Sequence, residues 1–375
     1  MRIVFIITRS DDIGGAQIHV RDLSKALRAA GHDAIVLAGM DGVLADELRA
    51  RGVPYYPLHH LGREVGPLAD ARCLSELRQK LRELQPDLIS THSTKAGFLG
   101  RIAGKTLDIP TLFTAHGWGF TEGRPPLQAV GFWAVERATA TWAARIITVC
   151  ESDRAAALRA RVASSDRLVT IHNAMPDVDP ALRARPGRSP ARLVMVARLS
   201  RWKDQPTLLQ ALSGLKDLDW QLDLVGDGPL REQLEALVHR LDLTSRVTFL
   251  GFRRDVPERI AEAQVFLLIS KWEGFPRSIL EAMRAGLPVI ASDVGGVRES
   301  VVDGTTGFVI PRGDDARLRE GLRRLITSSE LRVRMGQAGR ARYEEMFTFD
   351  RLVERTTQVY ETVLKGNNGY EFSFS

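Results

Sequence analysis

Short apolar runs alternate with helix-length amphipathic stretches along the first half of the chain. The run Ile3–Thr8 is followed by a glycine-containing turn and then by a helical pattern over His19–Ala30. Four later apolar runs are also predicted to be strands: Ala34–Ala38, Asp87–Thr91, Thr111–Ala115 and Arg145–Val149. Continuous apolar strands indicate a sheet covered on both faces, and their alternation with helices indicates parallel βαβ units.

The pattern stops at Asp177–Pro190, which is rich in Pro, Arg and Ala and has no apolar periodicity. We interpret this segment as a linker. A second series of strands is predicted at Arg192–Ala197, Gln221–Val225, Val247–Leu250, Val265–Ile269, Pro288–Ala291 and Gly307–Ile310. Helices are predicted at Pro229–Leu241, Ser278–Ala285, Asp314–Thr327, Leu331–Met346 and Asp350–Lys365. The sequence therefore predicts an α/β fold with two tandem Rossmann-like, doubly wound domains that face a cleft.

The predicted domain boundaries follow these changes of pattern. An N-terminal, acceptor-side domain is expected over residues 1–176, a linker over 177–190 and a nucleotide-sugar-binding domain over 191–348. A final helix at 349–365 is expected to cross back to the first domain, and a tail at 366–375 is expected to be disordered. Each domain should bind its ligand at the carboxyl ends of its strands.

Composition narrows the class of protein. The chain has 375 residues, 44% of them hydrophobic and 26% charged, as is usual for a globular protein of two domains. Its net charge of +6 permits anionic partners, but the basic residues form no concentrated stripe, so we expect no nucleic-acid partner. The cysteines Cys73 and Cys150 form neither a metal spacing nor a disulfide framework. We see no signal peptide and no run of roughly 18 apolar residues, so we expect a cytoplasmic protein.

The strongest chemical signal is a pair of glutamates, Glu273 and Glu281, that frame a Gly-Phe-Pro turn and a predicted helix start. Backbone N–H groups at a helix N-terminus suit a diphosphate. Glu273 can accept hydrogen bonds from sugar hydroxyls and Glu281 from ribose hydroxyls. The alternative is that Glu273 caps the helix and Glu281 is a solvated helix residue.

A second signal follows the first strand of the second domain. Arg198 and Lys203 can converge on phosphates there and neutralise the charge of a leaving diphosphate. The alternative is two solvated loop cations. Two aspartate pairs, Asp177/Asp179 and Asp217/Asp219, resemble a metal-binding spacing. One lies in the expected linker and the other precedes a strand, so we expect neither a metal nor a cofactor.

Weaker signals lie in the first domain. Gly15 belongs to a glycine pair that follows the first strand and could let the backbone approach a phosphate. His116 stands at another predicted strand end, although a lone histidine can also be purely structural.

Taken together, these motifs resemble the retaining nucleotide-sugar glycosyltransferases of the group 1, family 4 type, with GT-B architecture. The resemblance rests on the E-x7-E and ARL-x-x-x-KD segments, the early GGA, the mid-domain His-Gly, GDGPLR at 226–231 and FLGF at 249–252. Residues 92–101 and the TAHGWGF stretch are similar to enzymes of bacterial surface-polysaccharide synthesis, of O-antigen or capsule type. The resemblance implies a nucleotide-diphosphate sugar donor, expected to be UDP-linked with GDP as the alternative.

The resemblance also implies roles for individual residues. Gly15 would approach the donor phosphate, His116 would lie near the reacting centre, and Arg198 and Lys203 would hold the diphosphate. Glu273 would bind the transferred sugar and Glu281 the ribose. The remaining donor contacts would come from a loop beside the nucleotide base and from the turn and first residues of the helix that follows Glu273: Phe252, Gly274, Phe275, Pro276, Arg277 and Ser278.

No side chain is an evident nucleophile, so we expect front-face displacement in which the leaving phosphate assists deprotonation of the acceptor. Two other functions stay open: a sugar-nucleotide 2-epimerase of the same architecture and a non-catalytic nucleotide-sugar-binding subunit. The expected acceptor is a glycan or a polyprenyl-diphosphate-linked glycan at the inner face of the membrane. Peripheral membrane contact is expected through aromatic residues of Phe132–Trp142 and through cations at 72, 78, 80, 82, 95, 101 and 105.

Overall fold

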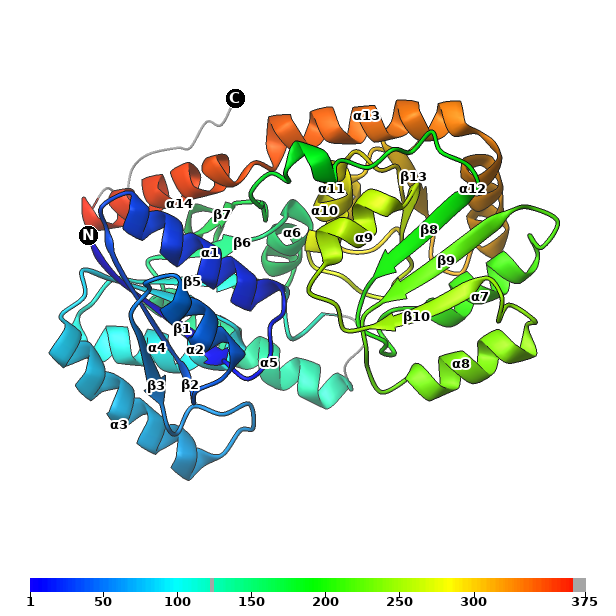
Figure 1. The fold of residues 1–375 in the computed structure, drawn as a ribbon. Helices are drawn as coiled ribbons and strands as arrows, with labels where there is room; N and C mark the ends of the chain where they lie inside the picture. The colour runs from blue at the N-terminus through cyan, green and yellow to red at the C-terminus, as the bar shows by residue number, and fades with distance from the viewer. Residues whose placement is uncertain (122–124, 367–375) are drawn as a thin grey trace. The chain divides into compact units, whose positions relative to one another are not determined.

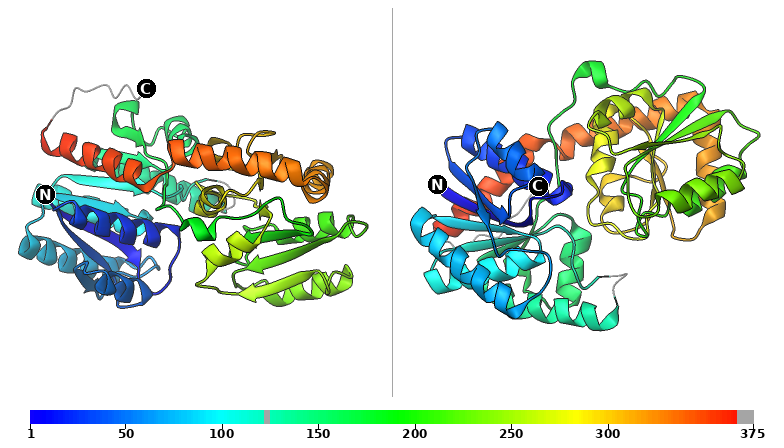
Figure 2. Two further views of the ribbon diagram at one scale, coloured as in Figure 1. Left: turned by 45° about the horizontal axis from the view of Figure 1, so that its top comes forward. Right: turned by 60° about the horizontal axis from the view of Figure 1, so that its bottom comes forward.

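The computed structural model describes residues 1–121 and 125–366 and divides the chain into two compact units. The N-terminal unit contains residues 1–173 and the C-terminal segment from Leu352, and the C-terminal unit is Ala174–Arg351. Each unit is a parallel sheet with helices on both faces (Figures 1 and 2). Apart from its first residue, the predicted tail lies outside the described residues.

The N-terminal unit has a seven-stranded sheet in the order β3-β2-β1-β4-β5-β6-β7. The strands are β1 (Arg2–Arg9), β2 (Asp33–Gly39), β3 (Tyr55–Leu58), β4 (Leu88–His92), β5 (Thr111–Ala115), β6 (Arg145–Thr148) and β7 (Leu168–Thr170). The helices are α1 (Gly15–Ala29), α2 (Val43–Ala50), α3 (Pro67–Leu84), α4 (Thr94–Leu107), α5 (Pro126–Thr139) and α6 (Glu151–Arg159). The strand order reverses between β1 and β4, and ligands bind doubly wound sheets at such a switch point.

The C-terminal unit repeats this winding in a six-stranded sheet, β10-β9-β8-β11-β12-β13. Its strands are β8 (Ala191–Val196), β9 (Trp220–Val225), β10 (Val247–Gly251), β11 (Val265–Leu268), β12 (Val289–Ser292) and β13 (Gly307–Ile310). Its helices are α7 (Gln205–Ser213), α8 (Arg231–Arg240), α9 (Val256–Glu262), α10 (Arg277–Ala285), α11 (Val297–Ser300), α12 (Asp315–Thr327) and α13 (Ser329–Met346). The switch point lies between β8 and β11.

The central strands are buried along most of their length, which confirms the expectation of sheets covered on both faces. Ile3–Ile7 of β1 and Val265–Leu268 of β11 are buried without interruption. Because both faces pack against helices, every position of these strands is apolar or internally hydrogen-bonded. No helix among the described residues is long and apolar enough to cross a bilayer.

Two strands that the apolar pattern did not reveal form the edges of the first sheet. β3 contains Pro57, which cannot donate a ladder hydrogen bond and is tolerated on an edge. β7 is only three residues long. Edge strands need little apolar sequence because one side of each lacks a neighbouring strand.

The segment 177–190, which was expected to be a linker, lies inside the C-terminal unit. The fully buried Arg332 of α13 donates to the carbonyl oxygens of Pro186 and Arg188 at 2.6 and 2.7 Å. Arg340 of the same helix is ion-paired with Asp177. Polar contacts therefore hold this segment, and its lack of apolar periodicity does not mark a flexible connection.

The last helix, α14 (Phe349–Leu364), belongs to the N-terminal unit from Leu352 onward. Its Tyr360 is fully buried and donates a hydrogen bond to Ser90 Oγ of β4 at 2.8 Å. Residues from the two ends of the sequence therefore share the core of the N-terminal unit.

Candidate active-site residues

Two loops of the C-terminal unit meet at its switch point and bring Lys203 to Glu273. Lys203 follows β8, and its backbone forms an antiparallel bridge with Ser270, which follows β11. The Lys203 ammonium donates to Glu273 Oε1, and the Glu273 side chain is 9% exposed. Lys203 and Glu273 come from two different predicted motifs, 70 positions apart, and are joined in one partly buried ion pair. Arg198 lies exposed in the same loop, and its carbonyl oxygen accepts from Gln205 Nε2 at 3.1 Å.

A glycine supports the backbone at Glu273. Gly295 has φ of +54°, and a Cβ atom on it would lie 2.1 Å from the carbonyl oxygen of Glu273. Gly296 donates its N–H to the Gly274 carbonyl at 2.7 Å. The loop that carries Glu273 therefore rests directly on the Gly295-Gly296 backbone, a contact that requires a residue without a side chain.

The turn after Glu273 leads into α10. Pro276 is the N-cap residue with φ of −72°, so it lies just outside the helix. Phe275 is buried against Phe347, with ring centroids 5.5 Å apart. This packing fixes the start of α10, where the N–H groups of Arg277 and Ser278 begin the helix and its dipole favours an anion.

Glu281 is the fifth residue of α10 and is partly buried. Burial raises the pKa of its carboxyl, while Arg284 and Arg277 act in the opposite direction. Glu273 lies in the loop before the helix, so the two glutamates have different backbone settings. The structure does not give Glu273 a helix-capping hydrogen bond among the described residues: its recorded partner is Lys203.

A third loop, after β9, packs against the one that carries Arg198. Cβ atoms on Gly226 and Gly228 would lie 2.2 and 2.3 Å from the carbonyl oxygens of Ala197 and Leu199. Gly226 also donates to the Gly251 carbonyl at 2.8 Å, at the end of β10. Phe252 follows and is 72% exposed. An exposed ring beside this glycine loop is available for stacking on a planar ligand.

In the N-terminal unit, Gly15 is the first residue of α1, directly after the β1 turn. No acidic residue occupies the first turn of this 15-residue helix, so its N-terminal N–H groups favour an anion. His116 follows β5 and is partly buried. Both residues stand at carboxyl ends of strands, as the sequence predicted.

The sequence did not reveal that His116 belongs to a cluster with His19 of α1 and His92 of β4. His92 Nδ1 lies 3.0 Å from His116 Nε2, and all three imidazoles offer nitrogen atoms within 4.8 Å of one another. Burial, with His116 as a lesser cause, lowers the pKa of His92 well below its usual value. The signal available in the sequence was that His92, like His116, ends an apolar run.

The two aspartate pairs have other partners. Asp177 is paired with Arg340, Asp179 accepts from the Ala181 N–H, and Asp217 accepts from Arg323 Nη1 at 3.0 Å. Within residues 1–121 and 125–366, the histidine cluster is the one group of three metal-ligating side chains that lie close together.

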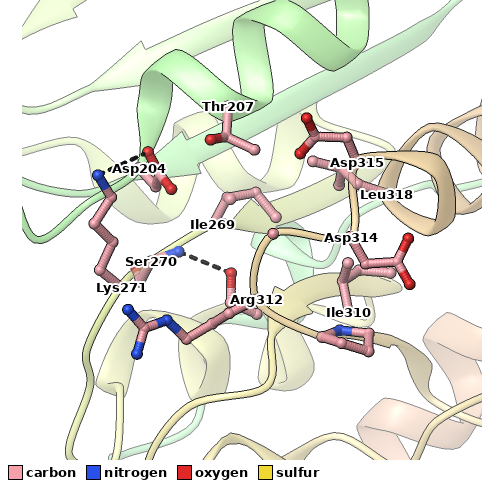
Figure 3. A pocket seen from close by; sticks show the side chains of 13 residues that line it. Asp204, Thr207, Ile269, Ser270, Lys271, Ile310, Arg312, Asp314, Asp315 and Leu318 are labelled. Atoms are coloured by element: carbon pink, nitrogen blue, oxygen red, sulfur yellow. Dashed lines mark hydrogen bonds and ion pairs between the residues drawn. The ribbon is translucent and has the colours of Figure 1, made fainter.

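A cavity of about 380 Å³ opens at the carboxyl ends of β11, β12 and β13 (Figure 3). Asp204 and Lys271 form an ion pair of 3.5 Å on its wall, and the Ser270 N–H donates to Ser292 Oγ at 3.0 Å. None of the predicted site residues lines this cavity. The cavity nevertheless adjoins the motif residues, because Asp204 follows Lys203 and Ser270 forms a backbone bridge with it.

The surface expected to meet a membrane is less basic than its sequence suggested. Arg101 is fully buried and pairs with the buried Glu136 at 2.7 Å, and burial raises the pKa of Glu136 against the effect of Arg101. Lys95 is paired with Asp70, and its side chain is 12% exposed. Arg101 and Lys95 are thus each paired with an acidic residue of this unit, because α4 turns these positions toward neighbouring elements.

Comparison with known proteins identifies the class. The model of "Glycosyl transferases group 1" matches residues 182–342, and the model of "Glycosyl transferase 4-like domain" matches residues 14–174. The two matches together span most of both units. The chain belongs to the group 1, family 4 type of glycosyltransferases and is a glycosyltransferase.

Individual relatives agree with this class. The chain is 28% identical over 335 residues, 84% of each chain, to the Escherichia coli enzyme named UDP-Gal:alpha-D-GlcNAc-diphosphoundecaprenol alpha-1,3-galactosyltransferase. Among solved structures, Anabaena Alr3699/HepE in complex with UDP-glucose superposes with a TM-score of 0.82 at 24% identity, over 96% of this chain and 100% of that one. Sucrose-phosphate synthase from Thermosynechococcus elongatus superposes with a TM-score of 0.84 at 22% identity, over 98% of this chain and 100% of that one. These structures confirm the predicted GT-B fold.

Proposed function

We propose that this glycosyltransferase transfers a sugar, with retention and without a metal ion, from a UDP-sugar to a polyprenyl-diphosphate-linked glycan in bacterial surface-polysaccharide synthesis. The observation that carries the proposal is the Lys203–Glu273 ion pair beside the start of α10 at the β8–β11 switch point. A fixed cation and a helix N-terminus favour a diphosphate, and a fixed carboxylate favours sugar hydroxyls.

The ion pair orders Lys203 before any ligand arrives. Because Glu273 already holds the ammonium, little side-chain freedom is lost when a phosphate oxygen approaches it. Arg198, exposed in the same loop, supplies a second cation for the diphosphate. Together these cations neutralise the charge that builds on the leaving group, which is the task that a metal ion performs in other phosphate sites.

The contacts with the sugar, the ribose and the base belong to the same proposal. Glu273 accepts hydrogen bonds from the transferred sugar, and the backbone of Gly274–Ser278 contacts sugar and phosphate. Glu281 binds the ribose and Phe252 contacts the base. Gly15 and His116 are the donor contacts proposed in the N-terminal unit. UDP is favoured as the nucleotide because the Anabaena relative is described in complex with UDP-glucose and the Escherichia coli relative is named for UDP-Gal.

The proposed chemistry is front-face displacement. The bond between the anomeric carbon and the diphosphate oxygen breaks, and the acceptor oxygen forms its bond to that carbon on the same face. The leaving phosphate oxygen takes the acceptor proton, so the products are the glycoside and the nucleoside diphosphate. The lipid-linked acceptor is supported by the diphosphoundecaprenol in the name of the Escherichia coli relative.

A turnover assay with labelled UDP-sugar tests the activity. Product that forms only when a polyprenyl-diphosphate glycan is added supports the proposal. Conversion of the donor to an epimer without acceptor would identify an epimerase instead. Binding of the donor without any turnover would identify a non-catalytic subunit.

We also propose peripheral contact with the inner face of the membrane. Of the cations predicted to meet the membrane, Arg72, Arg82 and Lys105 are exposed, and α5 presents Leu127 and Val130 at 86% and 57% exposure. Cations bind an anionic leaflet and apolar side chains insert at its interface. Co-sedimentation with phosphatidylserine vesicles should decrease when salt rises and when Leu127 and Val130 are replaced by Ser. Protein that stays in the supernatant at low salt would contradict this contact.

A further inference from the structure

A buried chain of hydrogen bonds in the N-terminal unit ends at His116. The Tyr360 hydroxyl of α14 lies 2.8 Å from Ser90 Oγ, and Ser90 Oγ lies 3.2 Å from His92 Nε2. On the far side of the same ring, His92 Nδ1 lies 3.0 Å from His116 Nε2. Tyr360, Ser90 and His92 are all 0% exposed, so bulk solvent does not reach these three side chains.

Counting the available protons shows which group donates in each hydrogen bond of this series. The two hydroxyl groups carry one proton each, and two hydrogen bonds link Tyr360 to Ser90 and Ser90 to His92. Within the described residues these hydroxyls have no other recorded partner. A proton on His92 Nε2 would leave one hydroxyl proton buried without an acceptor, which is costly. Ser90 therefore accepts from Tyr360 and donates to His92 Nε2.

The protonation state of His92 determines which ring donates in the hydrogen bond between His92 and His116. Burial lowers its pKa, so the ring is neutral and holds a single proton. Burial likewise raises the pKa of Tyr360, which keeps its hydroxyl protonated. Because His92 Nε2 accepts from Ser90, the His92 proton lies on Nδ1 and points at His116 Nε2.

We propose that Ser90, His92 and Tyr360 are positioning residues that fix the proton of neutral His116 on Nδ1, which makes this atom a hydrogen-bond donor. Its relevance to catalysis rests on the proposed function, in which His116 contacts the donor sugar. An Nδ1–H group suits a hydroxyl or carbonyl oxygen of that sugar. A His116 with its proton on Nε2 would instead present an acceptor there.

A metal ion is the competing use of this cluster. In a tetrahedral zinc site with Zn–N bonds of about 2.0–2.1 Å, ligand nitrogens are about 3.3 Å apart. The His92–His116 separation of 3.0 Å is close to this, and His19 completes a group of three. Coordination of a metal ion by His92 Nδ1 would require that atom to carry no proton. The hydrogen bond from Ser90 to Nε2 instead places the His92 proton on Nδ1. The two arrangements therefore exclude each other.

The test is nitrogen-15 NMR of histidine-labelled protein, which reads the tautomer of each ring from long-range proton–nitrogen correlations. His92→Gln and His116→Gln assign the signals. We expect the Nδ1–H tautomer at both His92 and His116 in the wild type. The Nε2–H tautomer at His92 or at His116, or loss of both Nδ1–H signals with one equivalent of zinc, would overturn the proposal.

Ser90→Ala removes the donor to His92 and should let both rings populate the Nε2–H tautomer. Ser24→Ala is the matched control, since Ser24 is also a fully buried serine of this unit but donates to the Arg21 carbonyl. Unchanged tautomers in Ser90→Ala would contradict the proposal. In the transfer assay, Ser90→Ala should lower turnover about tenfold, the usual effect of one lost hydrogen bond in a transition state. A wild-type protein with the expected tautomers but no transfer would refute the proposed function alone.

Discussion

The two units place their candidate residues at the same topological position and equip it with opposite chemistry. Between β8 and β11, the C-terminal unit holds the charged pair of Lys203 and Glu273. Around the β1–β4 switch point, the N-terminal unit holds neutral imidazoles and hydroxyl groups in a directed chain. The comparison shows that the doubly wound fold fixes where ligand-facing groups stand, while the side chains decide which part of a ligand each unit can bind.

The difference has a physical reason. The Lys203 side chain is 21% exposed, and this contact with solvent lowers the cost of holding two charges in the Lys203–Glu273 pair. His92 has no such contact and is neutral, so it can direct a proton without attracting an anion. The C-terminal unit is accordingly suited to a diphosphate and the N-terminal unit to uncharged hydroxyls.

The largest expected effect comes from Glu273→Gln, which removes the carboxylate but keeps the shape of the side chain. Transfer should fall by about 10²-fold, as when other preorganised polar groups are removed from a transition state. Binding of free UDP, measured by calorimetry, should be nearly unchanged. Glu281→Gln is the counterpart and should weaken free UDP. Interchanged outcomes would reverse the two assignments.

Lys203→Ala tests the cationic half of the same pair. It should weaken UDP binding by roughly 1.5–3 kcal/mol, the range for a charge-assisted hydrogen bond, and leave uridine binding nearly unaffected. Lys216→Ala is the control, because Lys216 pairs with the exposed Asp242 on the same unit. Equal losses for UDP and uridine would remove Lys203 from the phosphate site.

Gly295→Ala tests whether the charged site depends on its backbone support. The new side chain would meet the Glu273 carbonyl at 2.1 Å in a left-handed conformation, so unfolding free energy should drop by about 1–3 kcal/mol or more. Gly304→Ala, at φ of +75° with open space around it, should show only the conformational cost of about 1–2 kcal/mol. Equal denaturant midpoints for the two variants would argue against a close contact.

The smallest expected effect is that of chelation. If Arg198 and Lys203 neutralise the leaving group, transfer in excess EDTA should equal transfer without it. Loss of activity that Mg²⁺ or Mn²⁺ restores would show that the cations of the C-terminal unit do not suffice, and restoration by Zn²⁺ alone would direct attention to the histidine cluster.

Local pattern predicted most of the fold but failed where contacts are polar or short. The long apolar strands and the amphipathic helices were found because burial on both faces leaves a continuous signal. β3 and β7 were missed because edge strands need little apolar sequence. The sequence predicts a linker at residues 177–190 because the carbonyl groups bound by Arg332 leave no trace in composition. Arg101 was counted as a surface cation because charge alone does not reveal its buried partner Glu136.

The sequence by itself determined the class of the protein. Strand and helix periodicities predict two α/β units, and the combined motifs resemble the glycosyltransferase family to which the chain belongs. Such signals are local, since a few neighbouring residues carry each of them.

Only the tertiary structure decided which of these residues are joined. Lys203 and Glu273 meet because β8 and β11 are neighbours in the sheet. The chain that reaches His116 needs Tyr360, which is 270 residues from Ser90 in sequence and meets it because α14 packs in the N-terminal unit. Hydrogen-bond direction depends on which atoms are buried together, and that is settled by packing between distant segments, which no local pattern contains.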